Sequence, residues 1–254
     1  MPQHHTQSLS YWTAFQKTFR GGKYLMLRGF VMVVQLGTKR AILVQTSQSL
    51  FGIYSDLSGL EGLIFIFLFD GLHAIVPLIS TEKKISEDNH PENVGFVFRQ
   101  CALSSALLLI PASAFCLCAP WIYRATQQST SAIEYSDGYF KIALFAYYFD
   151  TLYRTLARLL MALKQQHLTL ITEACEGVLD IAFTALLVQQ QKYELLGYEG
   201  AYAAAALITL LLTGKLIYSH PDLKKYQSLI LQIICVALEW IYLRAAKNLI
   251  IHFM

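Results

Sequence analysis

The chain has 254 residues, of which 55% are apolar and 15% charged, whereas an ordinary soluble domain has roughly 45–50% and about 25%. Its formal net charge of +3 is too small to indicate a nucleic-acid partner. The apolar residues form blocks of about 20, which as α-helices cross a hydrocarbon core of about 30 Å. A soluble bundle would interrupt such blocks with a polar stripe, because each of its helices keeps one face in water. The composition predicts an all-α, polytopic transmembrane helix bundle with about six to seven spans.

We expect the spans, in chain order, at residues 24–48, 60–80, 101–123, 139–163, 168–188, 197–218 and 226–251. Residues 1–23 lack the apolar core of a signal peptide and are expected to form a cytoplasmic segment. Residues 24–218 would form a six-helix lobe, and residues 219–254 a loop and a seventh helix that would begin a missing second lobe. Lys39 and Arg40 interrupt the first block, and they would mark the end of a shorter, tilted span.

The positions of lysine and arginine predict the orientation of the chain. Basic residues gather before the first span, at Lys17 and Arg20, and in the loop after the second span, at Lys83 and Lys84. The loop before the sixth span carries only Lys192. Because basic loops are retained on the cytoplasmic side, this pattern predicts a multi-pass protein with a cytoplasmic N-terminus.

Charged residues also follow the faces of two predicted spans. The spacings place them on one face of each helix: Asp150, Arg154 and Arg158 in the fourth span, and Glu173, Glu176 and Asp180 in the fifth. The link between these spans is short, so they are expected to be antiparallel neighbours. We therefore predict ion pairs that join Arg154 or Arg158 to Glu173 or Glu176.

Two carboxylates lie deeper in the predicted spans, Asp180 and Glu239. An ionised group at the bilayer centre costs at least about 2.5–3.5 kcal/mol, so an intramembrane carboxylate is a candidate for solute or ion handling. If Asp180 carries ion coupling, the Asp180→Asn variant should fold but not transport. If Asp180 is a hydrogen-bonded packing residue, the same change should be nearly silent. Thr184 follows Asp180 on the same face. Glu176 is also a candidate, because the carboxylates of the fifth span repel one another and some of them are expected to hold a proton or a cation. The predicted substrate- or ion-binding residues are Asp180, Glu239, Thr184 and Glu176.

Several short stretches, in order, resemble the first half of the multidrug and toxic compound extrusion (MATE) family of transporters. They are Val97–Gln100 at the start of the third span, Ser136–Ile142 and Arg154–Gln166 at the two ends of the fourth, Gly177–Ile181 in the fifth, Leu196–Ala201 at the start of the sixth and Val236–Trp240 in the seventh. No single stretch is specific, and their order makes the resemblance.

The resemblance implies a secondary active transporter with two six-helix lobes around a cavity, which exports organic, cationic solutes by antiport with protons or sodium ions. Glu239 falls on the family's seventh-helix glutamate, and Asp180 and Thr184 fall where its fifth helix often has polar residues. At Lys39 and Arg40 the chain departs from the family, because many members place an acidic residue there. A full carrier would need about twelve helices, so the resemblance also implies a truncated product or a half that assembles with a second copy.

Two other functions fit the same sequence. The bundle could be a non-transporting membrane scaffold or degenerate transporter fragment, or it could be a flippase for lipid-linked sugars. An enzyme is not expected, because no nucleophile–base set or metal-ligand cluster stands out, and no cofactor or metal is predicted. The expected partners are the lipid bilayer, a small organic solute and a proton or sodium ion.

Overall fold

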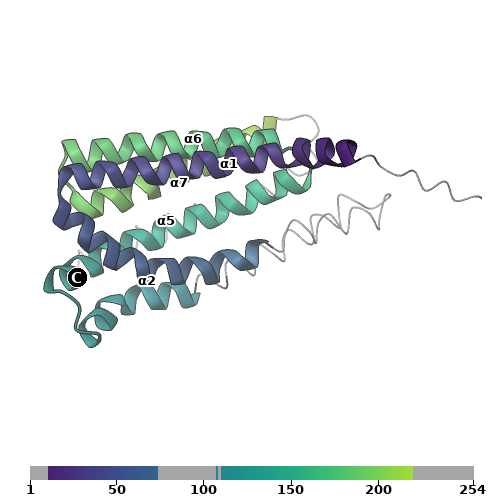
Figure 1. The fold of residues 1–254 in the computed structure, drawn as a ribbon. Helices are drawn as coiled ribbons and strands as arrows, with labels where there is room; N and C mark the ends of the chain where they lie inside the picture. Colours follow the sequence, from purple (N-terminus) through teal and green to yellow (C-terminus); the bar gives the residue numbers. More distant parts are fainter. Residues whose placement is uncertain (1–10, 74–106, 108–109, 220–254) are drawn as a thin grey trace, which may run out of the picture.

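The structure is a computed structural model, and it describes residues 11–73, 107 and 110–219 (Figure 1). Every element in these ranges is helical, which confirms the all-α prediction for this part of the chain. The elements are α1 (Tyr11–Thr46), α2 (Gln48–His73), a helical segment at 110–125, α5 (Thr130–Ala162), α6 (Gln166–Thr184), the π-helix η1 (Ala185–Gln190) and α7 (Glu194–Ser219).

The first two helices begin earlier than the apolar blocks that predicted them. Hydropathy marks only the lipid-compatible part of a helix, whereas backbone hydrogen bonding continues into the flanking polar residues. At the junction, Ser47 N donates to Leu43 O at 3.0 Å, and Phe51 N donates to Ser47 O at 3.2 Å. Thr46 Oγ1 also donates to Ile42 O at 2.9 Å, a contact that often bends helices. The chain therefore turns from α1 into α2 with its backbone bonds maintained.

Successive described α-helices run along the bundle in alternate directions, and η1 continues α6 (Figure 1). α5 packs chiefly against α7, and α6 packs against α7 and α1. Ser129 caps α5, because its hydroxyl accepts a hydrogen bond from Ala132 N at 3.2 Å. Aromatic residues of α5 fill the core, with Tyr139 and Phe140 fully buried and their rings edge to face at 5.3 Å. This layering leaves α1, α2, α6 and α7 around a common interior.

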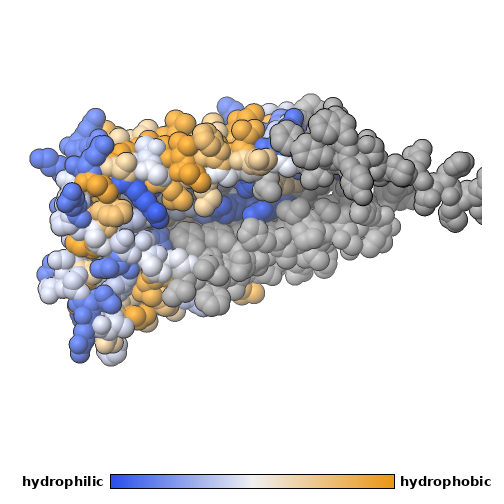
Figure 2. Space-filling view, viewed as in Figure 1, coloured by the Kyte–Doolittle hydropathy of each residue, from blue (hydrophilic) through white to orange (hydrophobic). Residues whose placement is uncertain are grey.

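Part of the outer surface is strongly apolar. On α1, Met26, Phe30 and Val33 are 66%, 67% and 70% exposed. Figure 2 shows an apolar band along one side of the molecule, next to a hydrophilic end. Within the described residues, one helix, α7, is long and apolar enough to cross a membrane by length and composition. The predicted number of six to seven spans is therefore not confirmed by these helices.

A tight contact joins η1 to the start of α7. Lys192 and Glu194 adopt the left-handed conformation (φ 56° and 52°), which reverses the chain between the two helices. A Cβ added at Gly197 would lie 2.9 Å from Tyr193 Cβ and 3.2 Å from the backbone carbonyl carbon of Leu187. Glycine at 197 is thus what permits this close approach.

We predict that Gly197→Ala destabilises the bundle by about 1–3 kcal/mol, the usual cost of overpacking. Gly200→Ala is the matched control, because its Cβ would meet only Leu187 Cδ1 at 3.9 Å. The control should be neutral, or stabilising by up to about 1 kcal/mol through lower chain entropy in the unfolded state. Thermal unfolding of both purified variants in detergent gives the comparison, and equal stability of the two would contradict the tight contact.

Candidate functional site

A cavity of about 560 Å³ lies among α1, α2, α6 and α7, with one contribution from α5. Its volume is within the range of about 300–1,000 Å³ typical of small-molecule sites. The charged and aromatic residues that line it are Lys39, Arg40, Glu61, Arg154, Glu176, Asp180 and Glu199, with Tyr54, Tyr198 and Tyr202. Ionisable groups thus converge on the interior of an otherwise apolar bundle.

An ion pair between α1 and α6 forms part of the cavity lining. Lys39 Nζ lies 2.8 Å from Asp180 Oδ1, and the two side chains are only 4% and 1% exposed. Gln35, one turn before Lys39, donates from Nε2 to Asp180 Oδ2 at 2.7 Å. Gly177, one turn before Asp180, also faces α1, since a Cβ there would lie in ordinary van der Waals contact with Gln35 Oε1 at 3.5 Å. Both carboxylate oxygens of Asp180 therefore have a partner on α1.

Two aromatic rings from α7 cover the same ammonium group. Lys39 Nζ lies 4.0 Å from the centroid of the Tyr198 ring and 5.4 Å from that of Tyr202. These distances are within the roughly 6 Å at which a ring face attracts a cation. Tyr198 is held in place by its hydroxyl, which donates to the Tyr54 hydroxyl at 3.3 Å. Lys39 is thus enclosed by a carboxylate and two ring faces.

Two further carboxylates in the cavity were not singled out as site residues from sequence. Glu61 is buried and accepts a hydrogen bond from the hydroxyl of Tyr139. Glu199 is also buried, close enough to Glu61, Lys39 and Asp180 to interact with them electrostatically. Both lie at the margins of predicted spans, where a charge is ordinarily solvated. The sequence does contain a signal for both residues, because an acidic residue within an apolar block is a functional candidate by default.

Some acidic oxygens in the cavity lack a protein partner. Among the described residues, neither Glu176 Oε1 nor Glu199 Oε2 has a hydrogen-bond partner, although both are buried. A buried carboxylate oxygen without a donor is costly, so such groups in native proteins call for an explanation. In this cavity, an ion, a water molecule or the ammonium group of a solute would be the partner of these oxygens.

The predicted site residues have different outcomes. Asp180 and Glu176 both line the cavity. Thr184 is fully buried one turn beyond Asp180, but it does not line the cavity, and its hydroxyl has no partner among the described residues. Glu239 lies outside the described residues, as does the predicted span at 226–251.

The salt bridge of Glu173 is not with the fourth span as predicted, although Arg158 of that span interacts with Glu173 electrostatically. The salt-bridge partner of Glu173 is Arg28 of α1, which binds both carboxylate oxygens. Arg154 instead donates from Nε to Asp150 Oδ2, one turn back on α5, at 2.6 Å. The short link does join α5 and α6, but α1 lies along α6 and supplies the cation for Glu173. Arg154 and Glu176 share the cavity and interact electrostatically, so that part of the prediction stays open to test.

A double-mutant cycle on Arg28 and Glu173 should show strong coupling. Each side chain is about 85% buried, with 16% and 15% exposed, and the pair is bidentate. We expect a coupling energy above about 1 kcal/mol from the unfolding free energies of Arg28→Gln, Glu173→Gln and the double variant. The matched cycle on Arg158 and Glu173 should give a clearly smaller value. Equal coupling in the two cycles would contradict this assignment of partners.

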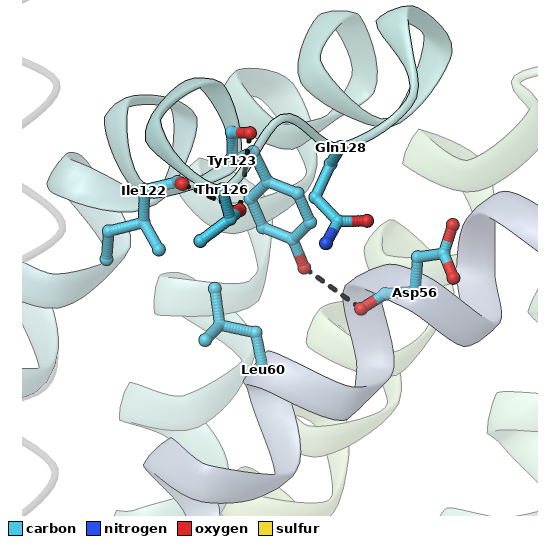
Figure 3. Close-up of a pocket in the computed structure, with 6 residues that line it drawn as sticks. All are labelled: Asp56, Leu60, Ile122, Tyr123, Thr126 and Gln128. Atoms are coloured by element: carbon cyan, nitrogen blue, oxygen red, sulfur yellow. Dashed lines mark hydrogen bonds between the residues drawn. The ribbon is translucent and has the colours of Figure 1, made fainter.

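A second, smaller pocket of about 250 Å³ lies at the end of segment 110–125 (Figure 3). There the Tyr123 hydroxyl donates to the backbone oxygen of Asp56 at 2.9 Å, which ties the segment to α2. Thr126 Oγ1 donates to Ile122 O at 2.9 Å within the same turn. These contacts join the end of segment 110–125 to the backbone of α2 and close its last turn, and we interpret this pocket as structural.

A protein-family model described as MatE matches residues 58–186. The match includes α2 from Ser58 onward and all of α5 and α6, and therefore both Glu176 and Asp180. Neither the curated proteins nor the solved structures contain a match to the chain.

Proposed function

Because the chain belongs to the MatE family, whose members are integral membrane transporters and not enzymes, we propose that it exports organic cations by ion-coupled antiport. The proposal places solute and ion handling in the 560 Å³ cavity. It also includes the multi-pass arrangement of six to seven spans, for which the alternating directions of the described helices are the structural support (Figure 1).

The observation that carries the proposal is the chemistry of this cavity. Four acidic and three basic side chains line it among the described residues, and two of the acidic groups keep an oxygen without a hydrogen-bond partner there. Tyrosine rings provide faces that attract cations. A positively charged organic solute therefore fits this lining better than an anionic or a purely apolar one. A scaffold has no need of buried carboxylate oxygens without a hydrogen-bond partner, because each of them lowers stability.

Transport by the full chain in proteoliposomes tests the proposal. Vesicles with an imposed proton or sodium gradient should accumulate a fluorescent organic cation such as ethidium faster than protein-free vesicles. Glu176→Gln should lower the initial rate roughly 10–100-fold, the effect of losing one charged hydrogen bond of about 1.5–3 kcal/mol. Glu134→Gln is the control, because Glu134 is exposed at the start of α5.

Folded protein that shows no gradient-dependent uptake would favour the scaffold instead. Movement of lipid-linked sugars without movement of ethidium would favour the flippase.

The proposed orientation places the N-terminus in the cytoplasm and Lys192, between η1 and α7, outside. A cysteine placed at Lys192, which is exposed, should react with an impermeant thiol reagent added to intact cells. A cysteine at Lys84 should react only after the cells are opened. Labelling of the Lys84 position alone from outside would reverse the orientation.

A further inference from the structure

The surroundings of Lys39 have the form of a binding site for an ammonium ion. Its Nζ atom is 2.8 Å from Asp180 Oδ1, and the ring centroids of Tyr198 and Tyr202 lie 4.0 and 5.4 Å away. Gln35 fixes the other carboxylate oxygen with a hydrogen bond of 2.7 Å. A carboxylate and two aromatic faces around a small cation are the groups that recognise free organic ammonium ions.

The polar and ring contacts of Lys39 join three different helices. The ion pair and both ring contacts are made by the terminal ammonium group, which comes from α1, whereas Asp180 is on α6 and both rings are on α7. The cage opens into the larger cavity, where the unpartnered Glu176 Oε1 and Glu199 Oε2 are also buried. Space and charge for a mobile cation therefore adjoin the position that the lysine fills.

We propose that Asp180, Gln35, Tyr198 and Tyr202 form an ammonium-binding cage, and that Lys39 is its built-in occupant. A tethered cation keeps Asp180 neutralised without a dissociable ion, so Asp180 of the native chain does not bind sodium. A primary alkylammonium ion does not displace the tethered Lys39 from the cage, but it takes the place of Lys39 when the lysine side chain is removed. The inference rests on the proposed function only in sharing its cavity, because it concerns binding and not transport.

The test uses the full chain, purified in detergent, and follows thermal unfolding. Lys39→Ala removes three methylene groups and the ammonium, which n-propylammonium replaces atom for atom. We expect n-propylammonium chloride to raise the Tm of Lys39→Ala saturably, on the order of 5 °C at high occupancy. 1-Propanol, which has the same shape without the charge, and sodium chloride at equal ionic strength should give no such rise. The native chain should not respond, because its cage is filled.

Two variants define the site. Lys141→Ala, which removes an exposed basic residue of α5 outside the cavity lining, should behave as the native chain does. Lys39→Ala combined with Asp180→Asn should lose the response to the amine. If Lys39→Ala does not fold by itself, it is expressed and purified with n-propylammonium throughout, and folded protein recovered only with the amine supports the cage.

A Lys39→Ala chain that n-propylammonium neither stabilises nor rescues overturns the proposal, as does an equal response in the double variant. In either case, the uptake of ethidium by the native chain would still stand as evidence for transport. Conversely, a cage that binds the amine in a chain without transport activity would leave the binding site intact and remove only the proposed function.

Discussion

Replacing Asp180 with asparagine is expected to destabilise the bundle by about 3–5 kcal/mol, because the change leaves a buried lysine without its counter-charge. Lys39 and Asp180 are 4% and 1% exposed, so water cannot take over the role of the carboxylate without rearrangement. From sequence, Asp180→Asn was expected to fold under the transport hypothesis. The ion pair with α1 changes that expectation, and a loss of transport by this variant alone would say nothing about mechanism.

The informative comparison is the double variant Lys39→Met, Asp180→Asn. It removes both charges and keeps both shapes, and replacing a buried ion pair by uncharged groups of similar volume is often close to neutral. Most of the lost stability should therefore return, which thermal or chemical unfolding in detergent measures. Transport by this folded double variant then reports the role of the pair in transport itself.

An exposed ion pair serves as the matched control. Asp137 and Lys141 of α5 are 58% and 50% exposed and lie one turn apart. Asp137→Asn should change stability by less than about 1 kcal/mol, as is usual for surface pairs. If Asp180→Asn were as mild as Asp137→Asn, Lys39 and Asp180 would not form a buried pair in the protein.

The faces of individual helices could be predicted from the sequence, because they depend only on the period of 3.6 residues per turn. Glu176 and Asp180 were placed on one face of α6 in this way, and they line the cavity together. The helix opposite that face could not be predicted. A short link brings α5 next to α6 at one end, but the cations that meet Glu173 and Asp180 come from α1, more than 100 residues away.

The basic pair on α1 shows a second limit of sequence patterns. Hydropathy treats Lys39 and Arg40 alike, as charges that end a span. In the structure α1 continues to Thr46, and consecutive residues point about 100° apart on a helix, so Lys39 is buried while Arg40 is exposed. Only the position of Asp180 on a neighbouring helix distinguishes the two, and no local pattern contains that information.

Tyr139 is expected to be the most sensitive position of the aromatic core. Its side chain is fully buried on α5 against the ring of Phe140, and its hydroxyl donates to the buried Glu61 of α2. Tyr139→Ala should cost about 3–5 kcal/mol, the range for truncating a large aromatic side chain in a core, and it also removes a donor from Glu61. Tyr193→Ala is the control, because that ring is 58% exposed, and it should change stability by less than about 0.5 kcal/mol.

Tyr139→Phe separates the ring from the hydroxyl. It keeps the packing of the ring and deletes the hydroxyl that donates to Glu61, so it should cost about 1–3 kcal/mol, the penalty for a buried acceptor that loses a donor. Combining Tyr139→Phe with Glu61→Gln should recover part of this loss, because a neutral amide depends less on a donor than a buried carboxylate does. The unfolding free energies of the two single variants and the double variant form a cycle. If Tyr139→Phe costs nothing, the hydroxyl does not stabilise Glu61. A cost equal to that of Tyr139→Ala would mean that the hydrogen bond, and not the packing of the ring, holds α2 against α5.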